Sequence, residues 1–135
     1  MFGAKSSKPQ TRIDSLIGSG TRIEGNIVFS GGLRVDGEIR GDVRAADGQA
    51  TTLVVSEQAR IEGEVRVAHL VVNGTVVGPV HATEFLELQP RSRVSGDVHY
   101  SALEMHLGAI VEGRLVHAPS AAEPKTIELK LAKSS

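Results

Sequence analysis

The sequence predicts an all-β fold: a single-domain parallel β-solenoid (β-helix) of about six coils with roughly 17 residues in each coil. Short apolar segments recur at intervals of 17, 20, 17, 16 and 17 residues, and each begins with a leucine. A second motif, [Ile/Val]-x-Gly-x-[Ile/Val/Leu], follows each leucine within eight residues. The leucines are Leu16, Leu33, Leu53, Leu70, Leu86 and Leu103, and the glycine motifs are Ile23-Gly25-Ile27, Ile39-Gly41-Val43, Ile61-Gly63-Val65, Val76-Gly78-Val80, Val94-Gly96-Val98 and Val111-Gly113-Leu115.

Within a coil, apolar and charged residues alternate. The segment 33–45 has apolar or small residues at every second position and charged residues between them. This period of two predicts strands with one buried and one wet face, and it does not fit a helix. At about 3.3 Å per residue, a 17-residue coil makes a circuit of roughly 56 Å, enough for three short strands and their corners. The motif glycines lie in phase with the buried positions, where they permit a bend.

The repeats divide the chain into three parts. Residues 1–15 are polar and lack the repeat, which predicts a flexible N-terminal arm. The array over 16–118 predicts the β-helix polymerisation domain. Two prolines, Pro119 and Pro124, then break the pattern and begin a C-terminal tail over 119–135.

Two segments depart from the regular pattern. Residues 46–51 lengthen the second coil and explain the single spacing of 20 residues, so we expect a loop there. Residues 126–131, in the tail, alternate like a strand. We expect a short extra strand there, which would cap or lengthen the last coil.

The two ends of the stack are the predicted functional surfaces. Coils pair their backbone groups with neighbouring coils everywhere except at the ends, and no amphipathic cap helix precedes the first coil. We therefore expect the chain to polymerise end to end. The predicted polymer contacts are Leu16, Ile23 and Ile27 in the first coil and Leu103, Met105, Leu107, Val111 and Leu115 in the last. The alternative is that these side chains form ordinary core that the tails cover.

Composition narrows the function classes. The formal net charge is −1, so no general electrostatic attraction to nucleic acid is expected. Aromatic residues make up 3% of the chain, less than ligand pockets normally use. Cysteine is absent, and no apolar run approaches the roughly 20 residues of a membrane span, so we expect a cytoplasmic protein.

The repeats and their flanks resemble the bactofilins, a family of bacterial cytoskeletal proteins. The resemblance rests on the six-coil array, on the stretches 35–44 and 59–65, and on the proline-bounded tails. It implies a right-handed, triangular β-helix that assembles without nucleotide into non-polar filaments, joined head to head and tail to tail. It further implies a scaffold for cell-wall enzymes that influences cell shape. The segment 126–131 departs from the family, which usually lacks a strand pattern there.

The resemblance also extends to the N-terminal arm. Its first residues look like the short membrane-targeting element of many bactofilins, which assigns that role to Met1, Phe2, Lys5 and Lys8. The partners implied are further copies of the chain, the inner face of the cytoplasmic membrane, cell-wall enzymes and other bactofilins. Nucleotide and nucleic acid are not expected as partners.

No catalytic, cofactor or metal site is predicted. His81 and His99 follow the closing valines of their coils and should lie one above the other on the outer face, with His117 one position out of phase. Two exposed imidazoles do not supply the three or four ligands of a metal centre. The outward carboxylates Glu24, Asp36, Glu62 and Asp97 are interpreted as a solubilising surface.

Two other function classes remain open. A hexapeptide-repeat acyltransferase is also a β-solenoid, but it uses strict six-residue steps and a histidine on a protruding loop, and residues 46–51 contain no histidine. A β-solenoid interaction module that does not polymerise fits the same repeats. We therefore expect a structural protein and not an enzyme.

Overall fold

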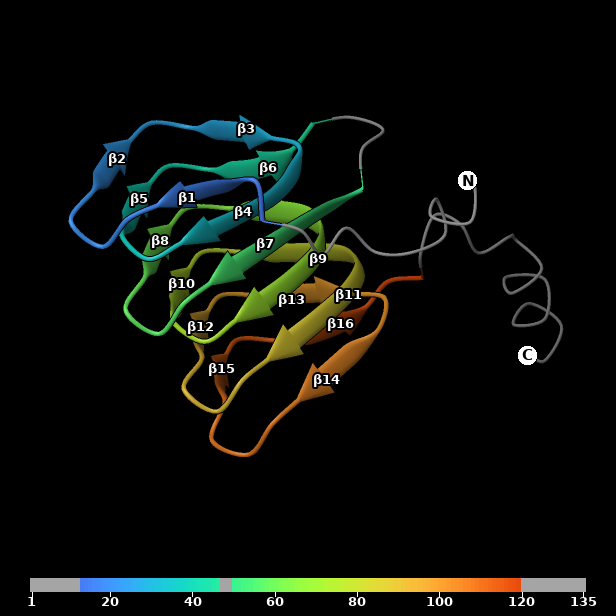
Figure 1. Ribbon diagram of the computed structural model, residues 1–135. Helices are drawn as coiled ribbons and strands as arrows, with labels where there is room; N and C mark the ends of the chain where they lie inside the picture. Colours follow the sequence, from blue (N-terminus) through green and yellow to red (C-terminus); the bar gives the residue numbers. More distant parts are fainter. Residues whose placement is uncertain (1–12, 47–49, 120–135) are drawn as a thin grey trace, which may run out of the picture.

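The solenoid predicted from the repeats is present. The computed structural model describes residues 13–46 and 50–119, which form sixteen strands and no helix (Figure 1). All strand pairs are parallel, and each coil contributes three strand segments. No helix in the described ranges could span a membrane.

The strands follow one another coil by coil. The first two coils contain β1 (Ser15–Ile17), β2 (Arg22–Glu24), β3 (Ile27–Phe29), β4 (Gly31–Val35), β5 (Glu38–Arg40) and β6 (Val43–Ala45). The middle coils contain β7 (Thr51–Val55), β8 (Arg60–Glu62), β9 (Val65–Val72), β10 (Thr75–Val77), β11 (Val80–Leu88), β12 (Arg93–Ser95) and β13 (Val98–Tyr100). The last coil contains β14 (Leu103–Met105), β15 (Ile110–Glu112) and β16 (Leu115–His117).

Stacking the coils produces three faces. Face A comprises β1, β4, β7, β9, β11 and β14, and face B comprises β2, β5, β8, β10, β12 and β15. Face C comprises β3, β6, β9, β11, β13 and β16. The long strands β9 and β11 turn the corner between faces C and A, so these two faces form one 10-stranded sheet, whereas face B is a separate 6-stranded sheet.

The core consists of columns of equivalent residues, as the motif predicted. Each inward residue lies above its counterpart in the next coil, and the middle members of every column are fully buried. The column of face B is Ile23, Ile39, Ile61, Val76, Val94 and Val111, and that of face C is Ile27, Val43, Val65, Val80, Val98 and Leu115.

The leucine column of face A is correct for five residues and wrong for the sixth. Leu33, Leu53, Leu70, Leu86 and Leu103 are stacked in register. In the first coil, however, Ser15 pairs with Leu33, while Leu16 pairs with the outward Arg34. The cause is whether an even or an odd number of positions separates a residue of face A from the inward residue of face B in the same coil. Ile23 lies eight positions after Ser15, as Ile61 lies eight positions after Leu53, but only seven positions after Leu16, which therefore points to the opposite side.

The corner between faces A and B absorbs the unequal coil lengths. Four-residue turns, closed by a backbone hydrogen bond, occur at Gly18–Thr21, Ser56–Ala59, Gln89–Ser92 and His106–Ala109. The second and fourth coils use shorter corners containing Gly37 and Gly74. At the corner between faces C and A, β6 ends at Ala45 and β7 begins at Thr51, so Thr51 is a buried strand residue and not part of a loop as predicted. Residues 47–49 of the predicted loop lie outside the described residues.

Glycines build the corner between faces B and C. The motif glycine of every coil has a φ between 139° and 157°, a backbone conformation that residues with a Cβ rarely adopt. The glycines are also stacked: a Cβ on Gly41 would lie 2.1 Å from the carbonyl oxygen of Gly25. From the second coil on, the motif glycine is therefore required both by the sharp bend and by the close approach of the preceding coil.

Candidate functional site: the two open ends of the solenoid

Large exposed apolar side chains are confined to the two ends of the described solenoid. Seven such side chains are exposed: Ile13, Leu16 and Val28 at the N-terminal end, and Met105, Leu107, Ile110 and Leu115 in the last coil. The four coils between them expose none within the described residues. Exposed apolar surface that gathers in this way is typical of an interaction site.

The C-terminal end is an unfinished layer of the core. Leu103, Met105, Val111 and Leu115 are the last members of the inward columns. Leu88 is fully buried, whereas its register partner Met105 is 43% exposed, because no described coil covers it. We call this set of four residues the C-tip. Its strands β14, β15 and β16 each pair on one side only within the described chain, so their other edges present free backbone donors and acceptors.

The N-terminal end is a second unfinished layer, less apolar than the first. Ile23 and Ile27 point inward and are half-buried, as predicted. Ser15 replaces leucine in the face A column, so this column ends in a hydroxyl group. Leu16 is 61% exposed but points sideways, because its register partner Arg34 is an outward residue. We call Ile17, Ile23 and Ile27 the N-tip.

Leu107 lies apart from the core columns. It is in the turn His106–Ala109, at the corner between faces A and B, and it is 96% exposed. Its position in the last coil places it beside the C-tip, although it is not part of the inward layer.

Sequence reasoning missed three exposed apolar residues. Val28 pairs with Arg44 and Ile110 pairs with Arg93, so both occupy outward positions where charged residues are usual in this chain. Ile13 precedes β1. No specific signal in the sequence marked them, because apolar residues at outward positions also occur in interior coils, as at Val54 and Val71.

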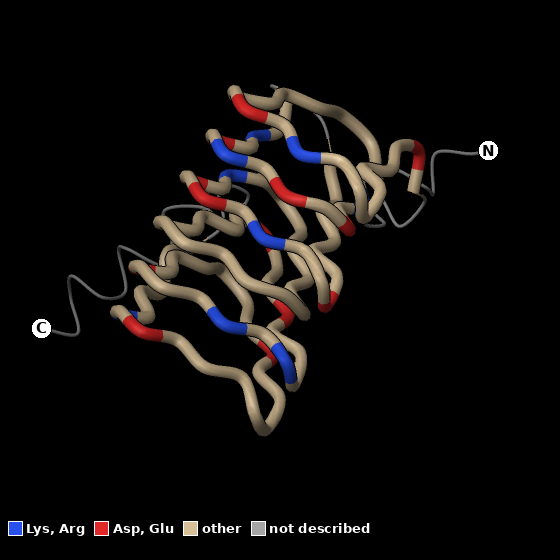
Figure 2. Tube along the Cα trace, turned by 90° about the vertical axis from the view of Figure 1, so that its left-hand side faces the viewer, with Lys and Arg blue, Asp and Glu red and all other residues tan. Residues whose placement is uncertain are grey.

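The sides of the solenoid are charged and self-paired. On face B, Arg and Glu alternate along the strands and between successive coils near the N-terminal end (Figure 2). Arg60 Nε lies 2.7 Å from Glu62, and the hydrogen bond that it donates lowers the pKa of this carboxyl. Exposed pairs of this kind contribute little to the stability of a fold, because water and salt screen them. The outward orientation of these carboxylates agrees with the predicted alternation, and their solubilising role stays a prediction.

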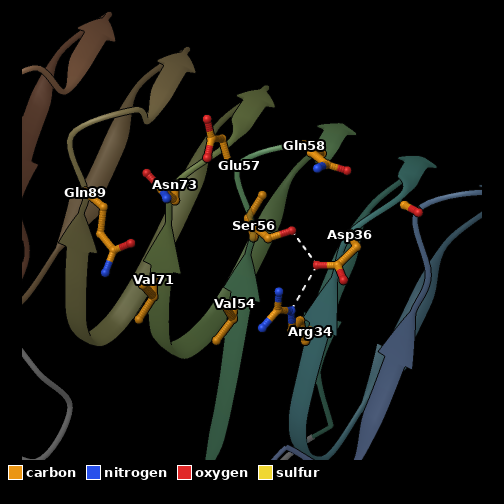
Figure 3. A pocket seen from close by; sticks show the side chains of 11 residues that line it. Arg34, Asp36, Val54, Ser56, Glu57, Gln58, Val71, Asn73 and Gln89 are labelled. Atoms are coloured by element: carbon orange, nitrogen blue, oxygen red, sulfur yellow. Dashed lines mark hydrogen bonds and ion pairs between the residues drawn. The ribbon is translucent and has the colours of Figure 1, made fainter.

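A groove of about 430 Å³ lies on face A beside the corner with face B (Figure 3). Its central carboxylate, Asp36, accepts a hydrogen bond from Arg34 Nε at 2.9 Å and contacts the Ser56 hydroxyl. The contact with Ser56 and then that with Arg34 lower the pKa of Asp36. Asp36 is therefore paired with its neighbours in the groove, and the lining contains no histidine that could act as a general base.

His81 and His99 lie one above the other on face C, as predicted. His81 and His99 are register partners whose rings stack with centroids 4.5 Å apart, and His117 pairs with Tyr100, one position out of phase. Burial, Arg66 and then His99 lower the pKa of His81. Its Nε2 lies 3.1 Å from a carboxylate oxygen of Glu64.

One cluster with metal-ligand chemistry was missed. Glu87 and Glu104 are register partners on the outer side of face A, and His106 lies at the adjoining corner. The imidazole Nε2 of His106 lies 3.0 Å from Glu87 and 3.3 Å from Glu104. These contacts account for the cluster without a metal. Its signal in the sequence was the identical placement of the two glutamates 17 residues apart.

Comparisons with known proteins agree with this architecture. The model of the Bactofilin family, described as polymer-forming cytoskeletal, matches residues 15–116. Bactofilin BacP of Myxococcus xanthus (strain DK1622) is 28% identical over 116 residues, which are 85% of this chain and 47% of that protein. The chain thus spans about half the length of this relative. No solved structure matches the chain. Since the family match extends from the first strand to the last and the solenoid carries the repeats, the chain belongs to the bactofilin family of polymer-forming cytoskeletal proteins.

Proposed function

We propose that this protein assembles into filaments by stacking its solenoids end to end through the C-tip and the N-tip. The observation that carries the proposal is the confinement of exposed apolar side chains to the terminal coils, together with the open strand edges there. A further solenoid at either end would pair these edges and bury the inward residues. Stacking at the ends thus continues the packing that holds successive coils together.

The free energy of this contact favours concentration-dependent assembly. Burying three or four side chains of the C-tip contributes about 5–10 kcal/mol, at about 1.5–3 kcal/mol each. Loss of translational and rotational freedom costs a similar amount, about 4–15 kcal/mol. Filaments should therefore form above a threshold concentration. No nucleotide is needed as an energy source, because burial of apolar surface drives the reaction.

The test is a charge placed in the C-tip. Leu115→Asp and Met105→Asp should abolish filaments and leave folded monomers or dimers, because a carboxylate cannot be buried unpaired in the contact. Val116→Asp is the matched control, since Val116 is the next residue of β16 and pairs with the outward His99. Negative-stain microscopy and sedimentation report assembly, and circular dichroism reports folding. Full-length filaments in both C-tip variants would contradict end stacking.

A solenoid that serves only as an interaction module would behave differently. It would remain monomeric in sedimentation at every concentration, with or without the substitutions. The same experiment therefore separates the two functions.

We further propose that the N-terminal arm attaches the filament to the inner face of the cytoplasmic membrane. Met1, Phe2, Lys5 and Lys8 lie outside the described residues, and the resemblance of the arm to bactofilin membrane-targeting elements supports the assignment. Met1 and Phe2 contribute about 2–4 kcal/mol together on entering the interface. Each lysine adds about 1 kcal/mol near anionic lipid. One arm is a weak anchor, but a filament presents many arms, and avidity makes the attachment stable.

A membrane-bound filament of this kind would organise cell-wall enzymes and other bactofilins and so influence cell shape. The relation to a polymer-forming cytoskeletal family supports this role. Deleting residues 2–8 should release preformed filaments from anionic liposomes while leaving their length unchanged. Undiminished co-sedimentation of the deletion variant with liposomes would exclude the arm as the anchor.

A further inference from the structure

The free edge of β14 is a binding surface for one more strand. On one side, β14 pairs with β11 through Leu86 and Leu103, Glu87 and Glu104, and Leu88 and Met105. On the other side, no strand of the described chain pairs with it, and Figure 1 shows it at the end of the stack. Its inward side chains, Leu103 and Met105, are left partly or largely exposed. A strand that occupies this edge must therefore supply two inward apolar residues with one outward residue between them.

The last two coils share a sequence triplet at this position of face A. Leu86-Glu87-Leu88 and Leu103-Glu104-Met105 both read apolar, glutamate, apolar, and they lie one above the other. The same triplet recurs as Ile127-Glu128-Leu129, in the segment 126–131 beyond the described residues. Its period matches the inward and outward alternation that the free edge requires.

The connecting chain is long enough for this placement. β16 ends at His117, and eight residues separate it from Thr126. At the same corner between faces C and A, five residues connect Ala45 of β6 to Thr51 of β7. The longer connection here can therefore make the same turn, and Pro119 and Pro124 keep it out of the strand pairing.

We propose that residues 126–131 dock in parallel against the free edge of β14 as a seventh strand of face A. In this register Ile127 covers Leu103, Leu129 covers Met105, and Glu128 extends the outward column of Glu87 and Glu104. The occupant is the chain's own tail and not a second molecule. Three stacked glutamates repel one another. His106, which already contacts Glu87 and Glu104, and Lys130, next but one to Glu128, offset this repulsion.

The docked strand covers only one of the three faces of the C-tip. Val111 on face B and Leu115 on face C stay uncovered by a further strand. If the C-tip joins solenoids, which rests on the function proposed above, the tail competes with a second copy for face A. The tail is then an autoinhibitory strand that a joining solenoid must displace.

Cysteine cross-linking tests the docking directly, because the chain contains no cysteine of its own. Four double variants are compared under mild oxidation at low protein concentration. Met105→Cys with Leu129→Cys, and Glu104→Cys with Glu128→Cys, each join residues on the same side of the sheet and should form disulfides within one chain. Met105→Cys with Glu128→Cys, and Glu104→Cys with Leu129→Cys, are the matched controls. Their Cβ atoms point to opposite sides, so their yields should be lower by at least about fivefold.

Non-reducing electrophoresis and mass spectrometry give the yields. Equal yields in all four variants, yields that favour the two control pairs, or disulfides formed only between chains would each overturn the docking. A truncated chain that ends at Pro124 tests the competition. It should form filaments at a concentration at least about threefold lower than the full chain, because its C-tip is always free. Unchanged assembly of the truncated chain would overturn the autoinhibitory role.

The two proposals fail in different ways. If no variant forms filaments at any concentration, end stacking is wrong, and the cross-linking pattern still decides whether the tail docks. If filaments form and the four cross-linking yields are equal, the tail proposal is wrong and end stacking stands.

Discussion

Leu88 and Met105 occupy the same column of face A one coil apart, and the difference between them shows what a repeat fold needs from its neighbours. Leu88 is fully buried because coils lie on both sides of it, whereas Met105 is 43% exposed. The same contrast holds for Val98 and Leu115 on face C. Interior and terminal coils thus share one sequence pattern, and their inward side chains differ in burial because only an interior coil has a neighbouring coil on each side. A terminal coil of this kind gains stability by acquiring one more layer.

The largest expected effect tests this contrast at the pair itself. Leu88→Ala removes a buried side chain and should lower the free energy of unfolding by about 2–5 kcal/mol. Met105→Ala, in a chain that ends at Pro124 and so lacks the tail strand, should lower it by less than about 1 kcal/mol, since far less apolar surface is lost. Urea unfolding measures both values in chains that also carry Leu115→Asp, which keeps them monomeric. Equal losses in chains that end at Pro124 would contradict the contrast between interior and terminal coils, whereas a larger loss at Met105 in the full chain is expected from the docked tail.

An intermediate effect is expected at the glycine corner. Gly63 has a φ of 151°, and a Cβ there would lie 2.2 Å from the carbonyl oxygen of Gly41. Gly63→Ala should therefore cost about 1–3 kcal/mol or more, through strain and displacement of the neighbouring coil. Gly18→Ala is the control, because a Cβ at Gly18 meets no atom within 4 Å. Thermal unfolding should separate the two variants, and similar melting temperatures would contradict the stacking argument.

The smallest effect concerns the pH dependence of the interior coils. Burial, followed by Arg66 and His99, lowers the pKa of His81 from its usual 6.5, so the folded protein binds this proton more weakly than the unfolded chain. Stability from this site is complete above pH 6.5 and is lost as the pH falls from there through the lower pKa of the folded state. His81→Gln should flatten this part of the stability curve, measured by urea unfolding between pH 7.5 and 5. His117→Gln, in the last coil, is the control, and an unchanged slope in the His81 variant would refute the assignment.

Much of this fold was readable from spacing alone. The residues that flank the motif glycines predicted the core columns of faces B and C completely. The two inward positions of each motif are always four residues apart, because the corner between these faces has a constant length. The leucine column was harder, because its corner varies in length. At Leu16, comparing the seven-residue interval to Ile23 with the even intervals of other coils would have revealed the opposite orientation.

Parts of the candidate site depend on contacts between coils that spacing does not specify. The last coil could be identified as an exposed layer, because Leu103, Val111 and Leu115 end the repeats. The exposure of Val28 and Ile110 could not, since outward apolar residues within a coil look like any other strand residue until the ends of the stack are known. The cluster of Glu87, Glu104 and His106 likewise depends on side chains from two coils meeting at a corner.

The unequal corners determine where this protein tolerates added sequence. The turn Ser56–Ala59 is two residues longer than the corners at Gly37 and Gly74, yet the strands on both sides of it keep their register. An epitope or fluorescent tag placed in this turn should leave the neighbouring layers undisturbed. The glycine corner has the same length in all six coils, so a tag inserted there would disturb the alignment of the strands that stack on both sides of it.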